Sequence, residues 1–177
     1  LIDEMLKQYD GQPRTVLDLG TGSGAIAITL ALECPNWQIN AADISTAALN
    51  VAQANAEQLH ARVNFKISDW LTNFNGQKFD FIVSNPPYID VNDVHLKQGD
   101  LRFEPQIALT DMQNGLTNYM HLIDTVPDYL NTNGQLWFEH GYDQAATIRD
   151  LMRQKGYSDV RTIIDLGGNE RVTTGHI

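Results

Sequence analysis

The sequence predicts an α/β protein with a mostly parallel, doubly wound sheet. Short apolar runs alternate with segments of helical periodicity, a glycine-rich turn follows the first run, and polar motifs follow later runs. Alternation of strand and helix implies parallel strands joined by helical crossovers, with ligands bound at the carboxyl ends of the strands.

The first part of the chain gives a short helix, a strand and a longer helix. Apolar residues recur at helical spacing over 2–9. Residues 15–19 are an apolar run that ends at Gly20, and 25–32 place isoleucine and leucine among alanines. We therefore expect a strand at 15–19 and a helix at 25–32.

Three further strands are expected before residue 85. The run at 37–42 reads as the second strand, and a helix follows at 45–58 with Ser45 as a suitable N-cap. The runs at 62–67 and 79–84 predict the third and fourth strands.

The second half begins with a polar stretch between Tyr88 and Asn114 that has no clear period, which we interpret as an active-site loop. Helical spacing returns over 116–130, a strand is expected at 135–139, and another helix at 144–155. Gly156 ends that last helix.

The chain closes with two expected strands at 160–165 and 171–175. Gly167, Gly168 and Asn169 join them and are residues typical of a tight hairpin turn. We therefore expect an antiparallel hairpin at one edge of the sheet.

Composition limits the class of protein and its partners. The 177 residues fit one domain, no apolar run approaches the roughly 20 residues that cross a bilayer, and no leader is recognisable. The single cysteine, Cys34, cannot form an internal disulfide, so we expect a cytoplasmic protein that does not associate with membranes. A net charge of -10 argues against extended nucleic-acid binding.

The four residues after the fourth strand, Asn85, Pro86, Pro87 and Tyr88, form the most distinctive turn. The prolines have fixed φ and no N–H, so the turn offers carbonyl acceptors rather than donors. The Asn85 carboxamide oxygen is another acceptor, and the Tyr88 ring is a surface for stacking. These residues predict a site for a planar group with an NH2, facing an electrophile. A simple proline-rich turn is the alternative.

A glycine-rich loop follows the first strand and opens the helix after it. The loop consists of Gly20, Thr21, Gly22, Ser23 and Gly24. Glycines permit a tight turn and close approach of the backbone to a ligand. With Ala25 the loop also satisfies the pattern of dinucleotide sites, so NAD is a second candidate. Asp43 is placed for ribose hydroxyls under either reading, or it caps the next helix.

The loop, together with acids after the next two strands, resembles the first motifs of S-adenosylmethionine-dependent methyltransferases. The spacing over 18–24, Asp43 and the pair Asp69-Trp70 carry this resemblance. In that family the acid after the third strand accepts from the adenine amino group, and its neighbour packs on the ring. The alternatives are a loop-capping Asp69 and an ordinary core Trp70. The resemblance implies S-adenosylmethionine as cofactor, held by residues 20–24 with Asp43, Asp69, Trp70 and Asn85.

The Asn-Pro-Pro-Tyr motif resembles that of methyltransferases acting on NH2 nitrogens conjugated to a π-system, which include adenine and glutamine amide enzymes. Hydrogen bonds from both N–H groups to the Asn85 side-chain oxygen and the Pro86 carbonyl would orient such a nitrogen. In-line displacement then depends on positioning more than on a strong base. The resemblance implies catalytic roles for Asn85, Pro86 and Tyr88, and substrate contacts from these residues and Pro87.

Segments 102–105, 108–109, 138–141 and 169–172 extend the similarity to the release-factor glutamine methyltransferases (HemK/PrmC type). That family implies methyl transfer to the side-chain amide nitrogen, N5, of the glutamine in the Gly-Gly-Gln motif of peptide chain release factors. A helical amino-terminal domain precedes the catalytic domain in that family. No such segment is visible in these 177 residues, and we interpret residues 1–177 as the catalytic domain.

Two rival functions use the same residues. An adenine amino (N6) methyltransferase acting on RNA or DNA would use the same turn, but the net charge and the lack of a basic segment count against it. A binding module or dehydrogenase would use the glycine-rich loop for NAD.

The remaining polar residues give no clear functional pattern. Glu139-His140 at a strand end is a candidate metal or acid–base pair, but the histidines show no metal-ligand spacing, so we expect structural histidines and no metal. Cys34 has no base nearby in sequence and no assigned role. Glu104 is either a substrate-loop contact or a solvated carboxylate.

Overall fold

The computed structural model describes residues 1–89, 109–111 and 113–177. Most of the expected active-site loop between Tyr88 and Asn114 therefore lies outside the described residues. The same holds for segment 102–105, with Glu104, and for Ala108 and His95.

The described residues form one seven-stranded sheet with the strand order β3-β2-β1-β4-β5-β7-β6. β1 to β5 are parallel, whereas β7 runs antiparallel to both β5 and β6. The strands are β1 (Arg14–Leu19), β2 (Trp37–Asp43), β3 (Val63–Ile67), β4 (Phe79–Ser84), β5 (Leu130–Glu139), β6 (Ser158–Ile164) and β7 (Glu170–His176). The predicted doubly wound sheet and its antiparallel hairpin are both confirmed.

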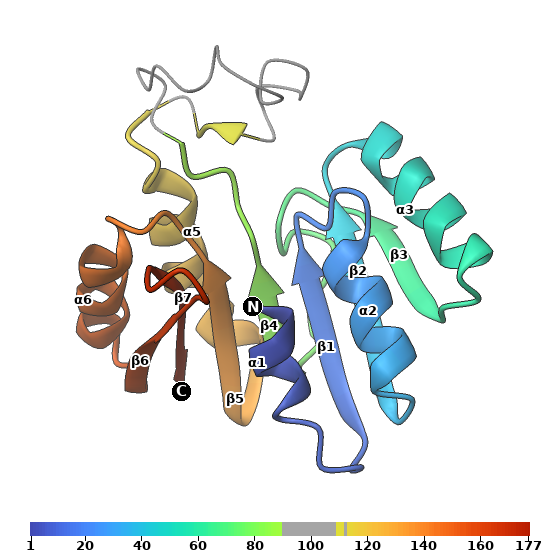
Figure 1. The fold of residues 1–177 in the computed structure, drawn as a ribbon, viewed down its shortest axis with the longest axis horizontal. Coiled ribbons are helices and arrows are strands. Elements are labelled where there is room, and N and C mark those ends of the chain that lie inside the picture. Colours follow the sequence, from blue (N-terminus) through green and yellow to red (C-terminus); the bar gives the residue numbers. More distant parts are fainter. Residues whose placement is uncertain (90–108, 112) are drawn as a thin grey trace.

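Helices cover both faces of this sheet (Figure 1). They are α1 (Ile2–Leu6), α2 (Ala25–Glu33), α3 (Thr46–Gln58), α5 (Thr117–Thr125), the 3-10 helix η3 (Val126–Tyr129) and α6 (Ala145–Lys155). Ser45 is the N-cap of α3 as predicted, since its Oγ accepts from the Ala48 N–H at 3.2 Å. Gly156 ends α6 in the left-handed conformation. Among the described residues, no helix is long and apolar enough to cross a bilayer.

Two apolar clusters form the core, one on each face of the sheet. Successive strand residues point to opposite faces, and along β5 Leu136 and Phe138 join one cluster while Trp137 joins the other. The first cluster includes residues of α5 and α6, and the second includes residues of α1 and α2. The sheet is therefore buried on both sides, as parallel sheets require.

The expected helix at 116–130 is wrong in its last third, residues 126–130. The α-helix ends at Thr125 and continues as a 3-10 turn to Tyr129. Pro127 explains the change, because it lacks the N–H that would bond to the Ile123 carbonyl. The Tyr157 hydroxyl donates to that carbonyl instead, at 3.3 Å.

The start of β5 also differs from the prediction, at Leu130 rather than residue 135. Its pairing with β4 is irregular, since Phe79 pairs with Leu130 whereas Phe81 pairs with Gln135. Asn133 has a positive φ of 63° in this interruption. The polar residues there are typical of a turn between elements, whereas they lie within one strand whose register shifts against β4.

Candidate active site

The predicted site residues lie at the carboxyl ends of four adjacent strands. Leu19, the last residue of β1, pairs with Ala42 of β2 on one side and with Ser84 of β4 on the other. The glycine-rich loop follows Leu19, and Asn85 follows Ser84, so the two motifs begin side by side. The arrowheads of β1 and β4 point to the same edge in Figure 1.

The glycine-rich loop turns back over the end of β2. The N–H groups of Gly20 and Thr21 both donate to the Ala42 carbonyl at 2.9 Å. Gly24 has a φ of 85°, and a Cβ there would lie 2.8 Å from Ile28 Cδ1 and 3.1 Å from Ala52 Cβ. Glycine is therefore required where α2 begins, because α3 packs directly against the loop.

Asp43 holds this loop in place. Its Oδ2 accepts from the Gly22 N–H at 2.9 Å, and its Oδ1 accepts from the Ser45 N–H at 2.8 Å. The carboxylate thus connects the loop to the residue that caps α3. This contact resembles the helix-capping role that was the alternative for Asp43. Its contact with ribose hydroxyls stays a prediction.

Asp18 precedes the glycine-rich loop, and the sequence analysis assigned it no function of its own. It is fully buried, and burial raises its pKa to about 6, while the Thr21 hydroxyl opposes this by donating to Oδ2 at 2.7 Å. Its Oδ1 has no partner within hydrogen-bond distance among the described residues, although the backbone N–H of Ala27 is near enough to lower the pKa of the carboxyl in part. A buried carboxylate with an unused oxygen favours a positively charged or hydrogen-donating ligand nearby.

The segment after β3 lies against the same loop. The Ser68 N–H donates to the Asp43 carbonyl at 3.0 Å, and its hydroxyl donates to the Trp70 carbonyl at 2.7 Å. These bonds hold Trp70 at a positive φ of 45°, and a Cβ on Gly20 would lie 3.7 Å from the indole. Trp70 also packs against the core, and Asp69 is exposed. Trp70 is thus brought to the loop, and Asp69 precedes it directly.

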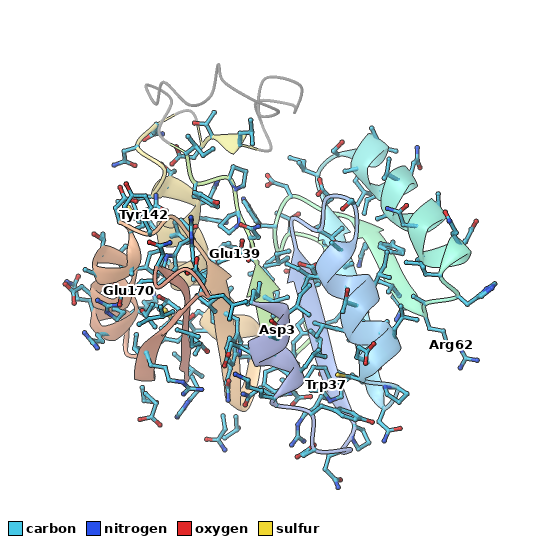
Figure 2. All side chains as sticks on the ribbon, in the orientation of Figure 1. Asp3, Trp37, Arg62, Glu139, Tyr142 and Glu170 are labelled. Carbon is cyan, nitrogen blue, oxygen red and sulfur yellow. The ribbon has the colours of Figure 1, made fainter. Side chains whose placement is uncertain are left out.

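Asn85 is exposed and is oriented by a residue of the neighbouring strand. Its Nδ2 donates to Glu139 Oε1 at 3.4 Å. A carboxylate only accepts, so Glu139 selects the amide orientation that turns Asn85 Oδ1 elsewhere. Among the described residues Oδ1 has no hydrogen-bond partner. Figure 2 shows Glu139 at the carboxyl end of β5, beside this turn.

The carbonyls of the Asn-Pro-Pro-Tyr turn are used unequally. The Pro87 carbonyl accepts from Asn118 Nδ2, and the Tyr88 carbonyl accepts from Gln144 Nε2, both at 3.0 Å. The Pro86 carbonyl accepts no hydrogen bond from any described residue. Pro86 is buried, while Pro87 and Tyr88 are half-buried. Two neighbouring acceptors, Asn85 Oδ1 and the Pro86 carbonyl, thus stay available for an external NH2.

Tyr88 packs partly against the core beneath the turn. Burial raises the pKa of its hydroxyl, and the Arg171 guanidinium partly opposes that rise. The phenol is therefore neutral at physiological pH, so Tyr88 contributes a ring and a neutral hydroxyl rather than a base.

The structure also locates the histidine and cysteine that the sequence analysis considered. His140 is buried, with Nε2 2.8 Å from Thr173 Oγ1 and Nδ1 2.9 Å from the Gly141 carbonyl, and burial lowers its pKa. It is a structural histidine. Cys34 is buried, which raises the pKa of its thiol. No group of three or more His, Cys, Asp or Glu within the described ranges could hold a metal ion.

Sequence reasoning missed the supporting contacts of the site. Glu139 was considered for metal or acid–base chemistry and as part of the matched segment 138–141, but not as a partner of Asn85, and Asn118 and Gln144 were not singled out. Each lies more than 30 residues from its partner in the turn. No local pattern reveals such pairs, because they exist only after the sheet has formed.

The fold and the edge site together define a Rossmann-like methyltransferase fold. A methyltransferase from Pyrococcus furiosus superposes with a TM-score of 0.73 at 20% identity, covering 98% of this chain and 80% of that one. At such low identity this match supports the assignment of the fold alone. A family model, the methyltransferase small domain, matches residues 1–100. The chain belongs to the methyltransferase small domain family.

The chain is also similar to proteins named release factor glutamine methyltransferase. It is 48% identical to that of Bordetella pertussis, over 100% of this chain and 66% of the relative. It is 51% identical to that of Neisseria gonorrhoeae, over 99% of this chain and 64% of the relative. The resemblance drawn from the motifs is confirmed, and the chain spans slightly less than two thirds of these relatives.

Proposed function

We propose that this chain is the catalytic domain of an enzyme that transfers a methyl group from S-adenosylmethionine to a glutamine side-chain amide. The acceptor is the glutamine N5 of the Gly-Gly-Gln motif in peptide chain release factors. The observation that carries the proposal is the pair of available acceptors, Asn85 Oδ1 and the Pro86 carbonyl, beside the glycine-rich loop. The similarity to the named relatives supports the same substrate.

The chemistry of the acceptor explains why such a site would help. An amide nitrogen is a weak nucleophile because its lone pair is delocalised into the carbonyl. Two N–H···O bonds, to Asn85 Oδ1 and the Pro86 carbonyl, would fix the nitrogen and increase its electron density. Glu139 keeps Oδ1 in the accepting position, and Tyr88 packs beside the bound group. Positioning of this kind contributes more than a base to an in-line displacement.

The donor side fits S-adenosylmethionine better than NAD. When bound, this cofactor supplies a sulfonium whose methyl group is the electrophile. Asp18 and Asp43 both accept hydrogen bonds from the loop, from Thr21 and Gly22, and a cationic cofactor would stabilise the buried Asp18 carboxylate. The pyrophosphate of NAD would face the same negative charges. Asp43 would bind the ribose hydroxyls and Asp69 the adenine amino group, with Trp70 against the ring.

The proposal is tested with labelled S-adenosylmethionine and three acceptors. These are an unmethylated release factor, its Gly-Gly-Ala variant and total RNA. We expect label on the release factor, none on the variant and none on RNA. Label on RNA alone would move the function to the adenine amino class. Tight binding of NAD without binding of S-adenosylmethionine would contradict both readings.

A further inference from the structure

The two prolines leave the middle of the Asn-Pro-Pro-Tyr turn without backbone donors. Pro86 and Pro87 have no N–H, so the turn depends on donors that reach its carbonyls. Among the described residues, two side-chain amides supply them: Asn118 on α5 and Gln144 at the start of α6.

Gln144 uses every part of its amide in this region. Nε2 donates to the Tyr88 carbonyl at 3.0 Å and to the Gly115 carbonyl at 3.1 Å. Oε1 accepts from the Gly141 N–H at 3.0 Å. One half-buried side chain therefore joins the turn after β4, the segment before α5 and the segment after β5.

The fit around this amide is close. Gly115 has a φ of 75°, and a Cβ there would lie 2.1 Å from the Tyr88 carbonyl oxygen and 2.8 Å from Gln144 Nε2. The Gln144 backbone is fixed as well, because its N–H donates to the Gly141 carbonyl and its carbonyl accepts from Ile148. Neither the amide nor the turn can shift without losing these contacts.

We propose that Gln144 is a positioning residue for the methyl acceptor. By occupying the Tyr88 carbonyl and fixing the turn, it leaves the Pro86 carbonyl and Asn85 Oδ1 aimed at the acceptor nitrogen. This inference rests on the proposed function. Gln144 does not touch the substrate, so it acts on turnover through the direction of the turn.

The test compares Gln144→Glu with Gln154→Glu, the same change at an exposed position of α6. A carboxylate cannot donate to the Tyr88 and Gly115 carbonyls, so we expect kcat to fall by about 10²-fold in Gln144→Glu, as for a misplaced reacting group. S-adenosylmethionine affinity should stay within about twofold. Gln154→Glu should match the wild-type protein in both.

The pH profile separates positioning from a general loss of structure. When the carboxylate introduced by Gln144→Glu is protonated, it regains one O–H donor and one acceptor. The rate of Gln144→Glu relative to wild type should therefore rise as the pH falls from about 7 toward about 4.3, the ordinary pKa of a glutamate. A ratio that does not change with pH, or a kcat within about twofold of wild type, would overturn the proposal.

Hydrogen–deuterium exchange tests the anchoring independently of turnover. The turn and the residue after it carry three backbone N–H groups, on Asn85, Tyr88 and Ile89. Their exchange should be faster in Gln144→Glu than in the wild-type protein and unchanged in Gln154→Glu. If the wild-type protein methylates no release factor, the proposed function is wrong. The exchange rates would still show whether Gln144 anchors the turn. Unchanged exchange in Gln144→Glu would reject the anchoring itself.

Discussion

At the scale of single residues, the site depends on how side-chain amides are turned. Asn85 presents Nδ2 to Glu139, which leaves Oδ1 for the proposed methyl acceptor. Sequence reasoning identified Asn85 because the residue and its proline neighbours form a rare local pattern. It could not identify what orients Asn85, since that contact spans 54 residues.

Removal of the Asn85 amide should affect catalysis and spare cofactor binding. We expect Asn85→Ala to lower kcat by about 10²–10³-fold, the scale for one preorganised polar contact. Steady-state kinetics and calorimetric titration with S-adenosylmethionine measure the two quantities. Asn50→Ala, an exposed change on α3, is the control. Collapse of cofactor affinity in Asn85→Ala would show that its role is wrongly assigned.

Glu139 should affect turnover by orienting the Asn85 amide. An amide at position 139 can either donate or accept, so Glu139→Gln no longer selects one orientation of the Asn85 amide. We expect turnover to fall by about tenfold, the value of one modest hydrogen bond. The control is Glu57→Gln, which makes the same change at an exposed site. Equal rates in both variants would mean that Asn85 needs no orienting partner.

Asp18 should make the stability of the ligand-free protein depend on pH. Its folded pKa is raised from 3.8 to about 6, so the folded state holds a proton that the unfolded state releases between these values. Stability from this group is therefore greatest at low pH and is lost as pH rises through about 6. The urea-unfolding free energy of Asp18→Asn minus that of wild type should rise over this range by up to about 3 kcal/mol.

The exposed Asp3 provides the matched comparison for this measurement. The rise measured for Asp18→Asn should exceed the change measured for Asp3→Asn over the same pH range. A rise for Asp18→Asn no larger than the change for Asp3→Asn would mean that the carboxylate is not destabilised by burial.

At the scale of elements, the sequence predicted best where local signals and tertiary structure agree. The strand at 79–84 and the N-cap at Ser45 are confirmed because apolar runs and capping side chains are local features. The start of β5 was missed because residues 131–134, where the register with β4 shifts, are polar residues typical of a turn. The end of α5 was missed because helical spacing continues past Pro127, where the N–H is lost.

The junction of α2 and α3 gives a prediction at this scale. Gly24→Ala should destabilise the protein by about 1–3 kcal/mol more than Gly11→Ala, because its Cβ meets Ala52. Both glycines have a positive φ, 85° at Gly24 and 78° at Gly11, but a Cβ on Gly11 would meet nothing within 4 Å. Urea unfolding of the two variants measures the difference. Equal destabilisation would assign the whole effect to backbone strain.

At the scale of the whole molecule, strand order creates the site. The order β3-β2-β1-β4 places the ends of four strands side by side, although their motifs span residues 18–88 of the chain. The sequence predicted which motifs follow which strands, and the doubly wound pattern predicted that they meet at one edge. The side chains from α5 and α6 that anchor the turn come from the half of the chain with weaker motifs, and packing alone brings them there.

The central claim is that the Asn85–Pro86 turn presents a glutamine amide to the methyl donor. Mass spectrometry of a release factor after incubation with the protein and S-adenosylmethionine tests it most directly. We predict one added methyl group on the side-chain nitrogen of the Gly-Gly-Gln glutamine, and far less of it with Asn85→Ala. A methyl group on another residue, or an unchanged yield with Asn85→Ala, would contradict the account.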